Sequence, residues 1–222
     1  MGATTDLISD SKRVLDPTDR FSEVVFGVMM ALTFTGTVSV ATAGRHEIRE
    51  MLYAALGCNV AWGIVDAVMY VLTCLADRGR GFRTVRSIDA APDAATGRRV
   101  VGEALPGGIA SILPGSVLEG IRAAIVERAA TLPRPRVTRD DLSGALAVFL
   151  LVVVATLPVT LPFVLLSDAG LALNVSKAVA LVLLFVSGAG LGHYAGFGTW
   201  RSGFVVLTVG AVLVAVIIAL GG

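Results

Sequence analysis

A carboxylate stands in the middle of a nearly continuous apolar run. In GCNVAWGIVDAVMYVLTCL, residues 57–75, Asp66 is the one charged residue. A charge near the centre of a bilayer costs at least about 2.5–3.5 kcal/mol, so such residues normally face a protein interior or a water-filled path. At about 1.5 Å per residue from position 75, Asp66 lies roughly 13 Å deep. The residue is a candidate for binding a cation or a proton, and a hydrogen bond to a neighbouring helix is the simpler alternative.

Polar and small residues share the helical face of Asp66. Asn59, Gly63, Asp66 and Tyr70 follow the spacing of one side of a helix, and Met69 lies beside them. A polar face on an otherwise apolar helix indicates contact with protein or water.

The preceding apolar segment, 22–43, offers a second carboxylate. Glu23 stands near its start, and Met30 lies about 12 Å from its inner end, near the depth of Asp66. Carboxylate oxygen suits hard or borderline divalent cations, and thioether sulfur favours softer ones, so a path with both would suit Fe²⁺ or Mn²⁺ better than Na⁺ or K⁺. We expect Glu23, Met30, Asp66 and Met69 to line this path, with Met29, Asn59 and Tyr70 as additional lining, and Glu23 and Asp66 to be the metal ligands.

Ordinary roles remain open for several of these residues. Glu23 could be a charge favoured by the dipole at a helix start. Methionines in a helical bundle usually serve packing.

These side chains must be positioned by apolar blocks of about 20 residues. Twenty residues is about the length of a helix that spans a bilayer. Of the 222 residues, 55% are hydrophobic and 16% charged, and the mean hydropathy is +0.81. We therefore expect an all-α integral membrane protein with five transmembrane helices and a cytosolic helical segment between the second and third. The expected spans are about 22–43, 51–75, 143–166, 170–192 and 202–220.

Arginines set the expected orientation. The connection 76–140 carries eleven of them, and cytoplasmic segments collect Lys and Arg. The N-terminus and this connection are then inside and the C-terminus outside, in a bacterial cytoplasmic membrane; the loop GRHEIRE is an exception. The expected organisation is a cytosolic segment 1–21, helices one and two in 22–75, a basic, amphipathic cytosolic segment 76–140, and helices three to five in 141–222.

An amphipathic helix is expected over 116–130, within the basic connection. Ser116 and Glu119 have the spacing of a capping box, and the prolines of TLPRPR end the helix. Its apolar stripe could lie on the membrane, on the bundle or on a second subunit. With a net charge of +1, no nucleic-acid partner is expected, and the arginines suit anionic lipid headgroups.

Glycines and prolines mark the later spans. Gly188, Gly192 and Gly196 recur every fourth residue and predict close helix contact. Pro158 and Pro162 interrupt the backbone ladder of the third span, where Thr hydroxyls or water could satisfy the freed carbonyls.

The order of these features resembles the vacuolar iron transporter family. Three stretches are similar to the family's first, third and last two spans: FSEVVFGVMMALTFTGTVSVA, TLPVTLPF and LLFVSGAGLGHYAGFGTWRSGFVVLTVGAVLVAVIIALGG. The resemblance implies a homodimer, an ion path at the subunit interface lined by the first two spans, and exchange of metal for protons.

Two departures from the family accompany this resemblance. The family's first-span Asp falls on Glu23, but its second-span Met near Gly-Glu-Tyr has no match, since Trp-Gly-Ile-Val-Asp surrounds Gly63 here. The family's Glu-rich cytosolic hairpin is also missing, because Glu103, Glu119 and Glu127 are scattered among arginines.

The expected function is export or sequestration of cytosolic Fe²⁺ or Mn²⁺ by proton antiport, with the metal as cargo and no permanently bound cofactor. The alternative is a non-transporting membrane scaffold or regulatory protein that keeps the fold. An enzyme is not expected, because the sequence has no paired His and acid motif, phosphate-binding glycine loop or serine nucleophile elbow.

Overall fold

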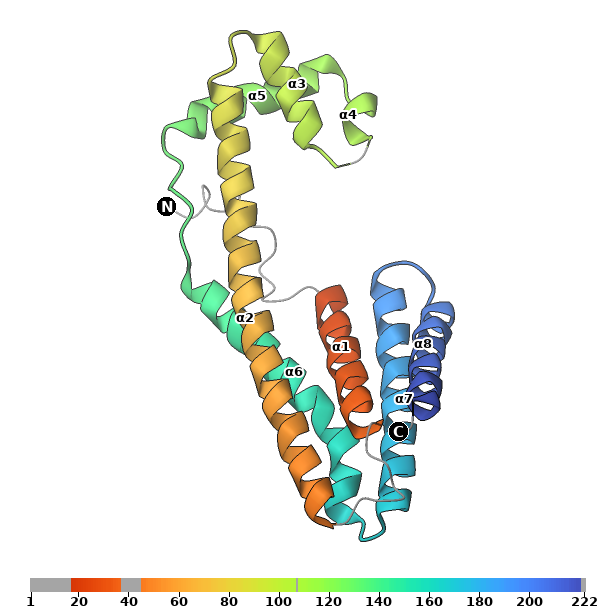
Figure 1. Ribbon diagram of the computed structural model, residues 1–222. Helices are drawn as coiled ribbons and strands as arrows, with labels where there is room; N and C mark the ends of the chain where they lie inside the picture. The colour runs from red at the N-terminus through yellow and green to blue at the C-terminus, as the bar shows by residue number, and fades with distance from the viewer. Residues whose placement is uncertain (1–16, 37–44, 107, 221–222) are drawn as a thin grey trace. The chain divides into compact units, whose positions relative to one another are not determined.

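The computed structural model describes residues 17–36, 45–106 and 108–220, with the backbone alone for 45–48 and 51. Within these ranges all regular structure is helical (Figure 1), which confirms the all-α prediction. The helices are α1 (Pro17–Gly36), α2 (Arg45–Asp89), α3 (Ala94–Ala104), α4 (Ile109–Ile112), α5 (Gly115–Ala129), α6 (Arg139–Leu165), α7 (Ala169–Tyr194) and α8 (Thr199–Ala219).

Four helices of the described chain are long and apolar enough to cross a membrane: α2 from Leu52 onward, α6, α7 and α8. Helix α1 has 20 residues but carries Asp19, Arg20 and Glu23 near its start, and it is not among the four. The expected end of the first span, 37–43, and most of the N-terminal segment lie outside the described residues.

The chain divides into two compact units. The described residues of the first lie within 13–70 and 140–222, and those of the second within 71–139. Helix α2 contributes residues to both.

The core of the first unit forms where α1, α7 and α8 lie side by side (Figure 1). Val28, Leu32 and Leu184 are fully buried there, together with Val159 of α6. The predicted close contact at the glycines of α7 is confirmed for Gly188 and Gly192, which pack against the first turns of α8. Gly196 instead lies in the turn after α7 with a φ of 76°, a conformation that favours glycine.

Helix α6 continues through Pro158 and Pro162. Thr156 donates to the carbonyl of Val153 at 2.8 Å, and Thr160 to that of Leu157 at 3.0 Å. Each hydroxyl thus binds the carbonyl one residue before the one that proline frees. The freed carbonyl lies only two residues before the threonine, whereas a helical threonine hydroxyl reaches back three or four residues. The predicted satisfaction of the freed carbonyls by these threonines was wrong.

The short connection from α6 to α7 makes them neighbours. Asp168 caps α7 by accepting a hydrogen bond from the amide of Leu171 at 2.6 Å. Further along, the Ser176 hydroxyl donates to the carbonyl of Val159 at 2.6 Å, which joins the two helices inside the bundle.

The helix predicted over 116–130 is confirmed as α5, but its capping box was wrong. Pro114 is the N-cap and makes no side-chain cap bond, so Ser116 lies inside the first turn. Glu119 instead accepts hydrogen bonds from Arg122 at 2.6 Å and from Arg98 of α3 at 3.1 Å. Two guanidinium groups bind a carboxylate more strongly than one backbone amide does.

Helix α2 extends beyond the predicted end of the apolar run at 75 to Asp89. The four arginines between 78 and 86 favour helix in this stretch, and Asp77–Arg80 and Arg86–Asp89 form ion pairs three residues apart. The apolar run ends near 75, whereas the helix does not.

We predict that Gly188→Ala destabilises the first unit. A Cβ at this position would lie 2.6 Å from Val206 Cβ and 2.9 Å from the backbone oxygen of Ser202. Overpacking of this kind costs about 1–3 kcal/mol, so the midpoint of thermal unfolding in detergent should fall. Gly57→Ala is the matched control, because a Cβ there meets nothing within 4 Å; an equal loss in both variants would contradict the packing argument.

We predict that acid loosens α3 and α5 through Glu119. Hydrogen bonds from Arg122, then from Arg98, lower the pKa of Glu119 from 4.5 to about 2. Because the folded-state pKa is the lower one, this stabilisation is present above pH 4.5 and is lost as the pH falls towards 2. Hydrogen exchange of α3 and α5 should accelerate in that window relative to Glu119→Gln, which lacks the carboxylate.

Glu103→Gln serves as the control for this measurement, since it removes an exposed carboxylate paired with Arg99 on the same helix. If Glu119→Gln and the unaltered chain respond alike between pH 4.5 and 2, the Glu119 pairs do not stabilise the unit.

Candidate functional site

The polar face of α2 is largely covered by α6. A Cβ on Gly63 would lie 2.9 Å from the ring of Phe149, and the Tyr70 ring packs against Gly144. The glycines allow a bulky aromatic side chain from the opposite helix to approach the backbone closely. The predicted lining residue Tyr70 therefore packs between α2 and α6.

Two carboxyl groups from different helices meet in this unit. Glu23, in the second turn of α1, and Asp66, near the middle of the apolar run of α2, lie within hydrogen-bonding reach of each other. Asp19, one turn earlier on α1, adds a further negative charge near Glu23. Two carboxyl groups in contact can share one proton, because two like charges there repel strongly.

Asn59 marks a second polar point on the same face of α2. Its side chain is 3% exposed, and its Nδ2 donates to the hydroxyl of Thr156 on α6. Asn59 and Asp66 are two helical turns apart, about 10 Å along the axis.

Two buried acceptor atoms stand out in the described part of the chain. Asn59 Oδ1 and Asp66 Oδ2 are the buried side-chain polar atoms there that have no hydrogen-bond partner. Other buried polar groups are satisfied: Thr35 donates to its own helix at 2.8 Å and Ser176 to Val159. Unpaired buried oxygens are costly, and these two can accept from water or bind a cation.

The three methionines of this region differ in burial. Met29 packs against the apolar core of the bundle, and Met69 is 53% exposed. Met30 is partly buried on α1. Across the described residues no group of three or more His, Cys, Asp or Glu could hold a metal ion. The oxygen donors near this face of α2 are those of the two carboxyl groups and the Asn59 amide.

Two residues of this region were missed by the sequence analysis. Thr156 was not expected to be the partner of Asn59, although a buried amide on an apolar helix requires a hydrogen-bond partner. Asp141, near the start of α6, is only 3% exposed, and the polar sequence around it gave no sign of burial.

No family model matches this chain, and no curated protein matches it.

We predict that Thr156→Val weakens the contact between α2 and α6. Valine keeps the shape of threonine but leaves Nδ2 of Asn59 without its acceptor, and such bonds between apolar helices contribute about 0.6 kcal/mol, up to about 1.7. Denaturant unfolding in detergent should show this loss. Thr160→Val is the control, because that hydroxyl binds carbonyls of its own helix; equal stability of both variants would contradict the role of the bond.

Proposed function

We propose that this chain is a membrane carrier that moves divalent transition-metal cations, Fe²⁺ or Mn²⁺, out of the cytosol in exchange for protons. The observation that carries the proposal is the meeting of Glu23 and Asp66 within a bundle of apolar helices. An ionisable residue in such a helix is by default a functional candidate, because it is expensive to keep there.

The chemistry of exchange follows from the shared proton. When the carboxyl pair releases its protons, it presents two negative charges to a divalent cation. When protons return, the pair becomes neutral and the cation leaves. Carboxylate oxygens bind borderline cations such as Fe²⁺ and Mn²⁺.

Further oxygen ligands on the path support this site. Asp66 Oδ2 is without a protein partner, and Asn59 Oδ1 offers a neutral acceptor two turns along α2. A cation that sheds part of its hydration shell at the carboxyl pair can use such oxygens in place of water. Met30 and Met69 are proposed to add sulfur contacts for softer cations.

The proposed topology has five spans, with α1 as the first. In this arrangement the arginines of 76–140 lie in the cytosol, with the N-terminus inside and the C-terminus outside a bacterial cytoplasmic membrane. The resemblance to the vacuolar iron transporter family suggests a homodimer in which the first two spans of each subunit line the path.

A second candidate is a non-transporting membrane scaffold or regulatory protein. The observation that favours it is the pairing of Glu119 with Arg98 and Arg122, since a carboxylate held by two cations cannot collect metal. We therefore assign no metal capture to this segment, and the carrier proposal depends on the carboxyl pair alone.

We predict that the chain reconstituted in liposomes carries Fe²⁺, Mn²⁺ or Co²⁺ only across a pH gradient. Asp66→Asn and Glu23→Gln should each lower the initial flux at least about tenfold, because losing even a group behind a metal ligand typically costs that much. The measurement is metal-dependent quenching of a dye inside the liposomes, with the unfolding midpoint of each variant recorded in parallel.

Glu103→Gln is the matched control, since it also removes one carboxylate but at an exposed ion pair with Arg99; its flux should equal that of the unaltered chain. An absence of flux for every metal, with Asp66→Asn as stable as the unaltered chain, would reject the carrier and favour the scaffold.

A further inference from the structure

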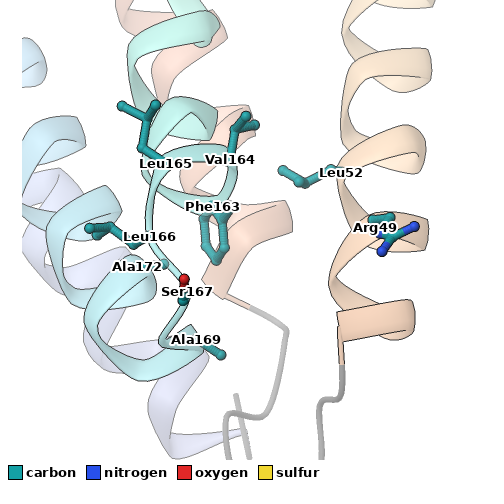
Figure 2. Close-up of a pocket in the computed structure, with 9 residues that line it drawn as sticks. All are labelled: Arg49, Leu52, Phe163, Val164, Leu165, Leu166, Ser167, Ala169 and Ala172. Atoms are coloured by element: carbon teal, nitrogen blue, oxygen red, sulfur yellow. The ribbon is translucent and has the colours of Figure 1, made fainter.

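An elongated groove lies between the first turns of α2 and the end of α6 (Figure 2). It consists of two cavities of about 370 and 350 Å³ that share Arg49, Leu52 and Val164. The first reaches Ser167 and the start of α7, and the second continues along α2 and α6. Figure 2 shows Arg49 and Leu52 on one side of the first cavity and the α6–α7 residues on the other.

One face of each helix lines the second cavity. On α2 the lining positions are three, four and seven residues after Arg49, namely Leu52, Tyr53 and Leu56. From Arg49 to Leu56 the groove follows about 10 Å of the helix. Asp66 lies ten residues beyond Leu56 along α2, so the groove is separate from the carboxyl pair.

The groove is charged at one end and otherwise mostly apolar. Arg49 is the one charged residue that lines either cavity, and no other described residue pairs with its guanidinium. Tyr53 lies one helical turn further on. Arginine and tyrosine are typical of the headgroup level of a membrane, whereas Leu56 and Leu157 continue the groove with hydrocarbon.

We propose that this groove binds one anionic phospholipid, with its phosphate at Arg49 and an acyl chain between α2 and α6. Charge complementarity selects the headgroup, because an exposed guanidinium attracts anionic lipid. The groove opens among exposed apolar side chains, Leu157 and Val164, of helices that are apolar enough to cross a membrane, where lipid is the surrounding solvent. This binding does not depend on cation transport.

Native mass spectrometry of the full chain in a neutral detergent tests the proposal. Phosphatidylglycerol and phosphatidylcholine with identical acyl chains are titrated separately. We expect the chain to retain phosphatidylglycerol about fivefold more strongly, the effect of one arginine at a membrane surface. Arg49→Gln should abolish this preference, and Arg201→Gln, which removes an exposed arginine at the start of α8, should preserve it.

Filling the groove provides a second test that leaves the charge unchanged. Val164 is 72% exposed and lines both cavities, so Val164→Trp should fold and should lower the retention of both lipids. Equal retention of the two lipids by the unaltered chain, an unchanged preference in Arg49→Gln, or full retention in Val164→Trp would overturn the proposal. Displacement of the lipid by glycerol phosphate alone would also overturn it, because the site would then recognise a free phosphate.

Discussion

Hydrocarbon offers no hydrogen-bond partner, so a polar group on an apolar helix must find one within the protein. The first unit follows this constraint at most of its buried polar side chains. Ser176 binds a carbonyl of α6, Thr35 binds its own helix, and the Asn59 amide binds Thr156. Against this background, the unpaired oxygens of Asn59 and Asp66 are informative. They share one face of α2, and Asp66 is one member of the carboxyl pair on which the carrier proposal depends.

Close helix contact is the second requirement of the unit, because apolar helices in lipid gain little from burying further apolar surface and depend on van der Waals packing. Small residues supply it. Gly188 and Gly192 receive side chains of α8, and Gly190 receives the Phe21 ring from α1. The three-helix core can then hold α1, and with it Glu23, at a fixed height beside the bundle.

The sequence was sufficient for the parts of the fold that depend on composition. Apolar runs predicted α6, α7 and α8, and Glu23 and Asp66 were expected to line one path. The depth count, however, matched Asp66 with Met30, whereas the structure brings Glu23 to Asp66. The sequence was insufficient where the structure depends on which residue a side chain pairs with. Glu119 bound two arginines in place of an amide, Thr156 became the acceptor for Asn59, and α2 continued to Asp89 beyond the end of its apolar run. Such pairings depend on residues far apart in the chain, and the hydrophobic periodicity of one segment does not predict them.

The two prolines of α6 have a mechanical consequence. Pro158 and Pro162 are four residues apart, so the two missing amide donors fall on nearly the same side of the helix. Two backbone hydrogen bonds are therefore absent on that side. Bending this stretch towards or away from that side stretches fewer hydrogen bonds than the same bend would in the rest of α6. The bending stiffness of this helix is therefore anisotropic. Thr156 precedes the compliant stretch and Val164 follows it, so a small bend alters the angle between the polar contact with α2 and the lipid-facing end of the same helix.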